Sequence, residues 1–214
     1  SKLYHEITEA LESTPKLFPE RAVVACQGIE GAYSQIAAEK LFAMPHIMFL
    51  STWERVFDAI DSNLCRYGVI PIENSTAGSV NKVYDLMIRR KFHIVRTVRI
   101  KVDHNLLAKP GVKRSEIREI FSHEQAINQC SAFLASLGNN VKITRVENTA
   151  MAAEAVAKSD RRDVASLSSR ACAGQYGLSV LAPSVQDNGN NHTRFICVAK
   201  HLEIYPGADR TTLM

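Results

Sequence analysis

The residues most able to do chemistry are hydroxyl and amide side chains that border the apolar runs of the 214-residue chain. They fall in six short segments: GIEGAYS (28–34), ENSTAGS (73–79), SHEQ (122–125), ENTA (147–150), SSRACAG (168–174) and DNGNNHTRF (187–195). Hydroxyls and amides donate and accept hydrogen bonds, and their protonation does not change near neutral pH. Together with the free N–H groups at helix starts, they suit a small anionic ligand. The sequence therefore predicts a binding site for such a ligand.

The first five of these segments also have a purely structural interpretation. Ser34, Ser75, Ser122 and Thr149 stand where helix-capping residues occur, and the glycines of the first segment suit a tight turn. Taken singly, each segment fits that interpretation better. All five, however, lie between an expected strand and an expected helix, at the edge where open α/β sheets bind ligands. Their repetition favours the ligand site.

Other kinds of catalytic centre lack their residue patterns. The seven histidines show no HxxxH or HxH spacing and no cysteine partner: His5, His46, His93, His104, His123, His192 and His201. We therefore expect no metal site. No full GxGxxG fingerprint, P-loop or GxSxG elbow occurs, so we expect neither a nucleotide cofactor nor a serine triad. For His123, which lies in a polar segment, we expect a neutral hydrogen-bonding role or a helix-start position rather than a catalytic base.

The polar segments must be positioned by the elements that precede and follow them. Apolar, β-branched runs alternate along the chain with residues that repeat at helical spacing. The expected strands include AVVAC (22–26), IMFLS (47–51), YGVIPI (67–72), EIREIFS (116–122), VKITRV (141–146), VASLS (164–168) and SVLAPSV (179–185). Apolar strands separated by helices are typical of sheets covered on both faces. The predicted fold class is α/β with mainly parallel sheets.

One segment breaks this alternation and divides the chain. HIVRTVRIKVDHNLLA (93–108) alternates over a longer stretch than one ordinary strand needs, with no helix inside it. We interpret it as a crossover between two lobes, and the strand at 193–199 as the return. The expected parts are a linker helix (1–19), lobe 1 (20–98 plus 190–206), lobe 2 (99–189) and the start of a further, truncated domain (207–214).

Composition and charge exclude several kinds of partner. A formal charge of +4 arises from 26 basic and 22 acidic residues, without the basic stripes of a nucleic-acid binder. No apolar stretch approaches the ~20 residues of a membrane span, and the amino terminus has no signal-peptide pattern. The 5 cysteines are scattered and never paired as CxxC, which is typical of a reducing compartment. We expect a cytoplasmic protein with no nucleic-acid and no membrane partner.

Four segments together resemble the ordered signature of the prephenate dehydratases. GIEGAYS, GVIPIENSTAGSV, SHEQAINQC and YGLSVLAPSVQDNGNNHTRF follow in the family's order and spacing over residues 21–200. The resemblance implies the two-lobed fold of type II periplasmic binding proteins, with a ligand cleft between the lobes, and a homodimer. It also implies an ACT regulatory domain that begins at RTTLM and an upstream chorismate mutase domain joined through the first helix. Ile29 and Glu124 stand where the family usually has proline.

The reaction implied by the resemblance converts prephenate to phenylpyruvate, water and carbon dioxide without a cofactor. Thr193 matches the family's catalytic threonine, whose hydroxyl would hydrogen-bond the departing hydroxide. Asn74, Ser75 and Gln125 match positions implicated in substrate binding or catalysis. The other expected substrate-binding residues are Arg194, Phe195, Ser34, Ser122 and Thr149.

Strand alternation leaves the role of Arg194 open. Along TRFICV, Thr193 and Phe195 share one face of the strand and Arg194 takes the other. Arg194 can bind the side-chain carboxylate of the substrate beside Thr193 only if the strand begins irregularly. Otherwise Arg194 forms a structural ion pair. Phe195 either walls the substrate ring or belongs to the core of the strand.

Three other functions fit the same residues. Arogenate dehydratase performs the same chemistry on a substrate that carries an amine in place of the keto group. A non-catalytic solute-binding module or a ligand sensor would use the same two-lobed cleft. Turnover of the two substrates separates the two enzymes, and detection of phenylpyruvate from prephenate separates an enzyme from a binder.

Overall fold

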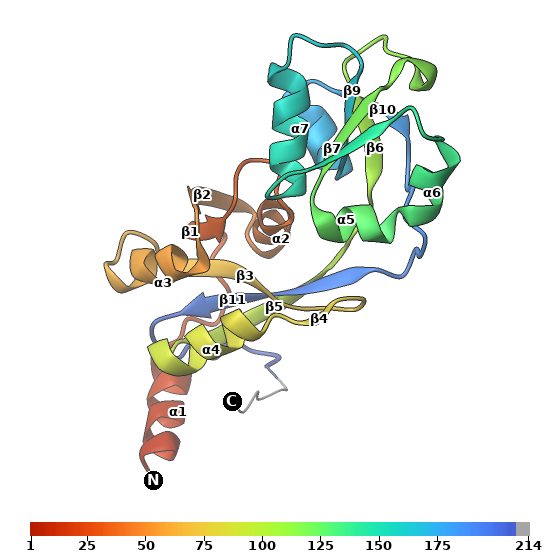
Figure 1. The fold of residues 1–214 in the computed structure, drawn as a ribbon. Helices are drawn as coiled ribbons and strands as arrows, with labels where there is room; N and C mark the ends of the chain where they lie inside the picture. Colours follow the sequence, from red (N-terminus) through yellow and green to blue (C-terminus); the bar gives the residue numbers. More distant parts are fainter. Residues whose placement is uncertain (209–214) are drawn as a thin grey trace. The chain divides into compact units, whose positions relative to one another are not determined.

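A computed structural model of the chain describes residues 1–208, which form two compact units (Figure 1). Unit 1 contains Ser1–Gln27, Ser34–Ile100 and the chain from His192, and unit 2 contains Gly28–Tyr33 and Lys101–Asn191. The expected ACT strand at RTTLM lies outside the described residues. Within residues 1–208, no helix is both long and apolar enough to cross a membrane.

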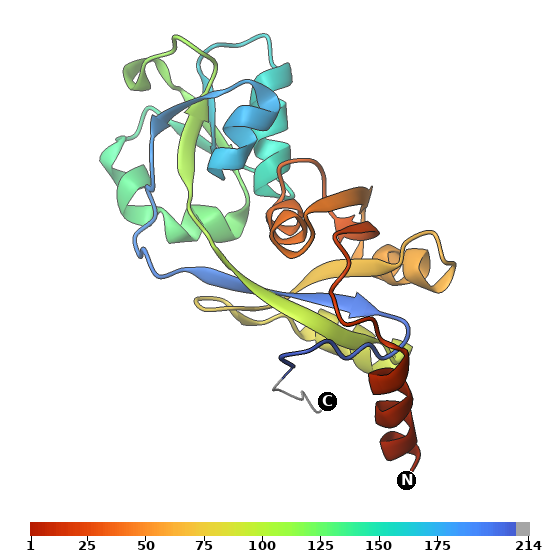
Figure 2. The ribbon, with the colours of Figure 1, turned by 180° about the vertical axis from the view of Figure 1, so that it is seen from behind.

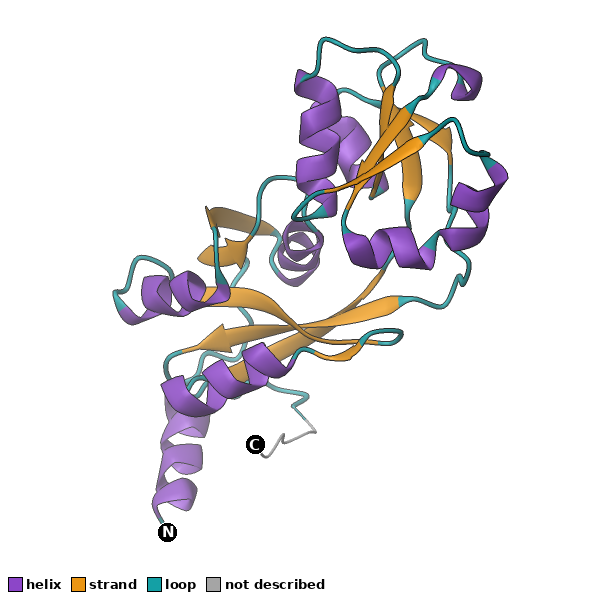
Figure 3. Cartoon of the chain, viewed as in Figure 1, coloured by secondary structure: helices purple, strands orange, loops and turns teal. Residues whose placement is uncertain are grey.

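Unit 1 is built on a six-stranded sheet flanked by helices (Figure 3). The strand order is β2–β1–β3–β11–β5, and β4 pairs with β3. The strands are β1 (Arg21–Gln27), β2 (Met44–Leu50), β3 (Tyr67–Asn74), β4 (Gly78–Ser79), β5 (His93–Lys101) and β11 (His192–Ala199). The helices are α1 (Lys2–Ser13), α2 (Tyr33–Leu41), α3 (Trp53–Asp61) and α4 (Asn81–Arg90). Figure 2 shows β11 and β5 as long neighbouring strands of this sheet.

The core of unit 1 follows from the helical spacing of its apolar residues. Thr52 caps α3, because its side chain accepts a hydrogen bond from the Arg55 N–H. The helix then buries Val56, Phe57 and Ile60 in one cluster with the apolar residues of β3 and β11. Burial of an apolar side chain of this size stabilises the fold by about 1.5–3 kcal/mol. This packing supports the two strands that carry the predicted catalytic segments.

Unit 2 contains a five-stranded sheet in the order β10–β6–β9–β7–β8. Its strands are β6 (Asn105–Ala108), β7 (Glu119–Ser122), β8 (Lys142–Arg145), β9 (Val164–Ser168) and β10 (Ser179–Ala182). Its helices are α5 (Glu124–Gln129), α6 (Ser131–Ser136), α7 (Thr149–Lys158) and α8 (Arg170–Tyr176), with a short 3-10 turn η1 (Arg114–Glu116). The α/β class is confirmed.

The sheets are mixed, which corrects the expectation of mainly parallel sheets. The pairs β1–β2, β1–β3, β7–β8 and β7–β9 are parallel, whereas β3–β4, β3–β11, β6–β9 and β6–β10 are antiparallel. A helical crossover within one sheet leads to a parallel strand. Strands β6 and β11 enter their sheets directly from the other unit, so that constraint does not apply to them.

Two expected elements are interrupted. The long segment at 93–108 forms β5 and β6, which belong to different sheets. The helix expected after SHEQ ends at Gln129, and α6 begins at Ser131. Asp187 explains this second break, because its carboxylate accepts from the Ser131 hydroxyl at 2.6 Å and from the Ala132 N–H at 3.0 Å. A side chain distant in sequence therefore caps the second helix.

Residues 28–33 belong to unit 2, which corrects their expected place in lobe 1. The Gly31 carbonyl accepts a hydrogen bond from Cys172 Sγ at 3.3 Å, and the Tyr33 hydroxyl donates to the Asp103 carbonyl at 2.8 Å. Gly31 has a φ of +92°, and a Cβ atom there would lie 2.9 Å from Cys172 Sγ. The glycine is therefore needed both for its backbone conformation and for its close approach to α8.

Candidate functional site

Thr193 and Asn74 are direct partners across the antiparallel pair of β11 and β3. Because the strands run in opposite directions, the start of β11 meets the end of β3. The Asn74 amide Nδ2 donates to Thr193 Oγ1 at 2.8 Å, although the two residues lie 119 positions apart in the sequence. The structure thus brings together the ENS and TRF segments within unit 1.

The amide of Asn74 has a defined orientation. Its Oδ1 accepts from the backbone N–H groups of Thr76 and Ala77, each at 2.9 Å. This arrangement is an Asx turn, which asparagine favours where a strand ends. On the other side of the amide, Nδ2 donates to the His192 carbonyl at 3.2 Å as well as to Thr193. The loop after β3 therefore determines which amide atom faces Thr193.

Ser75 joins the same cluster through His192. The Ser75 N–H donates to the His192 carbonyl at 2.9 Å, and the His192 N–H donates to Ser75 Oγ at 2.9 Å. The residue is exposed, and it lies one position beyond the end of β3. Three of the predicted residues, Asn74, Ser75 and Thr193, therefore form one hydrogen-bonded cluster, which we call the Thr193 cluster.

Arg194 and Phe195 lie on either side of an irregularity in the strand pair. The register passes from Arg194 opposite Glu73 to Phe195 opposite Pro71, so Ile72 is an extra residue on β3. Arg194 Nε lies 3.3 Å from Glu73 Oε1, and both side chains are 43% exposed. Because the extra residue lies on β3, the alternation of β11 itself is unchanged, and the contact with Glu73 is the ion pair of the second interpretation. Phe195 is only 4% exposed and belongs to the core.

Two predicted serines, Ser34 and Ser122, are buried inside their own units. Ser122 is 0% exposed, and its hydroxyl donates to the Leu167 carbonyl at 3.0 Å. Ser34 is 6% exposed, and its hydroxyl donates to the Gln27 carbonyl at 3.1 Å. Each hydroxyl satisfies a backbone carbonyl inside its own unit. Sequence patterns do not distinguish this use from ligand binding.

The predicted residues of unit 2 lie at the carboxyl ends of its strands. His123 begins α5 as predicted, and its Nδ1 accepts from the Gln125 N–H at 3.1 Å, which requires an unprotonated nitrogen. Gln125 itself is exposed in the first turn of α5. Thr149 is the first residue of α7, but the cap is Asn148, whose Oδ1 accepts from the Met151 N–H. Gln125 and Thr149 therefore lie at the edge of the unit 2 sheet where the sequence predicted them.

A charged pair at the same edge was not predicted. Arg145 ends β8 opposite Ser122, and its Nε lies 3.7 Å from the Glu124 carboxylate. Both side chains are largely exposed. Glu124 stands where the family that the sequence resembles usually has proline, and Arg145 balances its negative charge in part. The alternation of VKITRV marked Arg145 only as a strand residue.

A buried histidine in the crossover was also missed. His104 is 3% exposed, and its Nε2 lies 2.7 Å from Gln129 Oε1, which also accepts from Asn191 Nδ2 at 3.0 Å. Burial lowers the pKa of His104 below its usual value. The neutral ring therefore donates from Nε2 to Gln129. This network ties β6 to the segment that precedes β11, and no spacing in the sequence indicated it.

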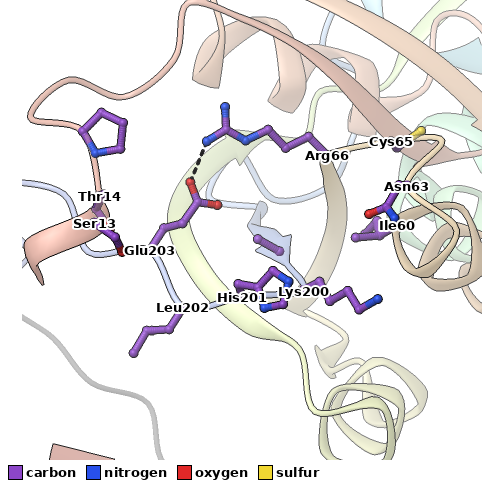
Figure 4. A pocket seen from close by; sticks show the side chains of 12 residues that line it. Ser13, Thr14, Ile60, Asn63, Cys65, Arg66, Lys200, His201, Leu202 and Glu203 are labelled. Atoms are coloured by element: carbon purple, nitrogen blue, oxygen red, sulfur yellow. Dashed lines mark hydrogen bonds and ion pairs between the residues drawn. The ribbon is translucent and has the colours of Figure 1, made fainter. Parts of the chain in front are cut away.

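The pocket in Figure 4 contains none of the predicted site residues. It lies in unit 1 and has a volume of ≈ 310 Å³; its polar lining includes Arg66, Lys200, His201 and Glu203. Arg66 is paired with Glu203 at 3.0 Å. Within residues 1–208, no three His, Cys, Asp or Glu side chains gather in a way that could hold a metal ion.

Comparison with known proteins points to one family. The family model described as prephenate dehydratase matches residues 24–203. Arogenate dehydratase 1 of Petunia hybrida is 40% identical over 187 residues, which cover 87% of this chain and 44% of the relative. The bifunctional chorismate mutase/prephenate dehydratase of Neisseria gonorrhoeae is 35% identical over 191 residues, which cover 89% of this chain and 53% of the relative. The chain spans about half the length of the curated relatives it matches.

A solved structure shares the fold over most of the chain. It is a prephenate dehydratase from Arthrobacter aurescens in complex with L-Phe, with a TM-score of 0.77 at 25% identity. The similarity covers 88% of this chain and 63% of that chain. The expected fold is therefore supported by an experimental structure as well as by sequence.

Proposed function

Since the chain belongs to the prephenate dehydratase family, we propose that it converts prephenate to phenylpyruvate with loss of water and carbon dioxide. Aromatisation of the ring drives this reaction. The protein must therefore orient the substrate and help the hydroxide to leave. The observation that carries the proposal is the hydrogen bond between Asn74 and Thr193, which holds a hydroxyl at the junction of the two signature segments.

Thr193 supplies the hydrogen bond to the leaving group. Hydroxide departs slowly unless a donor protonates or hydrogen-bonds it while the carbon–oxygen bond breaks. Thr193 Oγ1 accepts from Asn74, so its own proton is available for a further acceptor. A threonine hydroxyl is a weak acid, and the proton transfer is therefore concerted with bond cleavage. No metal or cofactor enters this step.

The two carboxylates of prephenate require different treatment. The ring carboxylate becomes carbon dioxide, so a tight ion pair with it would stabilise the ground state more than the transition state. The side-chain carboxylate keeps its charge and can be bound firmly. Arg194 is paired with Glu73, which supports a structural role for it. Gln125 and Thr149 are the proposed polar ligands from unit 2, where they lie at helix starts.

The names of the relatives do not decide between prephenate and arogenate as the substrate. The Petunia relative is named for arogenate and the Neisseria relative for prephenate. We take prephenate as the substrate and arogenate as the alternative. The values of kcat/KM for the two substrates, measured side by side, decide between them.

The test is turnover of prephenate by the 214-residue chain, followed through the appearance of phenylpyruvate. Thr193→Ala should lower kcat by about 10²-fold or more with little change in KM, because it removes an interaction of the transition state. Thr97→Ala, an exposed threonine of β5 in the same sheet, is the matched control. Binding of prephenate without phenylpyruvate formation would instead favour the solute-binding module or the sensor.

Several features expected from the sequence or from the family resemblance stay predictions. They are the homodimer, the cytoplasmic location, and the ACT and chorismate mutase domains that would flank this chain. Sedimentation of the purified chain measures the oligomeric state. The gene's full coding sequence decides which flanking domains are present.

A further inference from the structure

We propose that Asn74 is a positioning residue that directs the Thr193 proton toward the substrate and does not itself bind substrate. This inference rests on the proposed function, in which Thr193 donates to the leaving hydroxyl. It replaces the expectation that the Asn74 amide contacts the substrate. The hydrogen bonds of the amide lead to this assignment.

The hydrogen-bonding capacity of the Asn74 amide is fully used inside unit 1. A primary amide has two N–H donors and one carbonyl oxygen that accepts two hydrogen bonds. The oxygen accepts from the N–H groups of Thr76 and Ala77. The nitrogen donates to Thr193 Oγ1 at 2.8 Å and to the His192 carbonyl at 3.2 Å. A substrate could bind this amide only by displacing one of these partners.

The same contacts prevent the amide from turning over. After a 180° rotation, the NH2 group would face the two N–H donors of Thr76 and Ala77, and the oxygen would face the His192 carbonyl. Such donor–donor and acceptor–acceptor contacts would break the hydrogen bonds to Thr76, Ala77 and His192, which disfavours the rotated amide. Asn74 therefore always presents a donor to Thr193.

A fixed donor determines the direction of the Thr193 hydroxyl. Because Oγ1 accepts from Asn74, its own hydrogen must point away from the amide. Within residues 1–208, that hydrogen has no protein acceptor. The paired hydrogen bonds between Ser75 and His192, each 2.9 Å long, hold the two strand ends together beside it. The Thr193 hydroxyl is thus already oriented to donate its hydrogen before substrate binds. A departing hydroxide needs such a donor.

Asn74→Asp tests the direction of the hydrogen bond. One carboxylate oxygen can keep the two backbone N–H contacts, but the other would accept the Thr193 proton instead of donating. We expect kcat to fall about 100-fold near pH 8 while KM changes less than about threefold. As the pH falls and the new carboxyl group is protonated, it can donate again, and kcat should recover about tenfold or more relative to wild type.

The neighbouring titratable groups are shared by both proteins. Glu73, Arg194 and His192 adjoin the cluster residues in β3 and β11 and are unchanged, so the ratio of the two pH profiles removes their contribution. Asn81→Asp, at the exposed first turn of α4, is the matched control and should keep wild-type kcat and KM. A KM that rises at least tenfold in Asn74→Asp with kcat unchanged would assign Asn74 to substrate binding and overturn the proposal.

A double-mutant cycle is a second test of the positioning role of Asn74. It does not require the Asn74→Asp variant to fold. If Asn74 acts only through Thr193, Asn74→Ala should cost about 100-fold in wild type and less than about threefold in a Thr193→Ala background. Equal costs in both backgrounds would overturn the proposal. Circular dichroism and thermal melting confirm that each variant is folded.

The outcomes also separate this inference from the proposed function. If wild type does not convert prephenate or arogenate, or if Thr193→Ala keeps full activity, the proposed function fails and the inference fails with it. If wild type is active and Thr193→Ala is not, the proposed function stands. The Asn74 variants then decide the positioning role alone.

Discussion

Replacing Tyr67 by phenylalanine should weaken the attachment of the segment that follows β11 to the start of β3. Tyr67 is 0% exposed, and its hydroxyl donates to Glu203 Oε1 at 2.7 Å. The same oxygen accepts from Tyr205 at 2.5 Å and from Arg66 at 3.0 Å, the contact drawn in Figure 4. Three donors therefore converge on one carboxylate oxygen, and we call this group the Glu203 clamp.

The contacts of Tyr67 set the size of the expected effect. The ring can stay in place, because it packs against Phe18 and Phe42 with centroid distances of 5.9 and 5.4 Å. Only the hydroxyl is lost, and a hydrogen bond to a charged acceptor contributes about 1.5–3 kcal/mol. The Glu203 side chain is 15% exposed, so solvent screens this bond little. A loss of about 2 kcal/mol corresponds to a fall in Tm of about 4–8 °C for a protein of this size.

The assay is urea unfolding followed by the fluorescence of Trp53. Trp53 is the single tryptophan of the sequence, and it packs against the core of unit 1. Tyr84→Phe is the matched control, since Tyr84 packs against the same core and its hydroxyl has no hydrogen-bond partner within residues 1–208. A free energy of unfolding for Tyr67→Phe within about 0.5 kcal/mol of that control would refute the stabilising role of the clamp.

Three further predictions test other parts of the chain. Arg194→Gln should lower the free energy of unfolding by less than about 1 kcal/mol, because its pair with Glu73 is exposed; a KM raised tenfold would show that Arg194 binds substrate. Gly31→Ala should destabilise unit 2 by more than about 1 kcal/mol, whereas Gly174→Ala, which meets open space, should not; equal effects would contradict the docking of residues 28–33. Burial lowers the pKa of His104, so the stability that it contributes is present above about pH 6.5 and is lost as pH falls further, by at most about 1.4 kcal/mol per pH unit. Urea titrations of wild type and His104→Phe between pH 5 and 7 measure this slope, and identical slopes would contradict it.

The sequence was informative wherever local rules decide the outcome. The alternation of apolar runs with residues at helical spacing predicted the α/β class. His123 was correctly placed at a helix start, because capping depends on neighbouring residues only. The order of the polar segments indicated the family. Each of these features is encoded within a short stretch of chain.

The sequence did not predict features that depend on contacts between residues far apart in the chain. The break between α5 and α6 arises from Asp187, which lies far along the chain from both helices. The placement of residues 28–33 in unit 2 depends on the fit of Gly31 against α8. Nothing in the sequence around Ser34 and Ser122 indicated that both side chains are buried and donate to backbone carbonyls.

By itself, the sequence predicted the fold class, the family, and Asn74, Ser75 and Thr193 as residues of one candidate site. Only the tertiary structure decided how they act on one another. The register of β11 against β3 brings Asn74 and Thr193 together across 119 positions, and the Asx turn fixes which amide atom meets the hydroxyl. Strand register is set by packing on both faces of the sheet, so no local pattern contains the direction of that hydrogen bond.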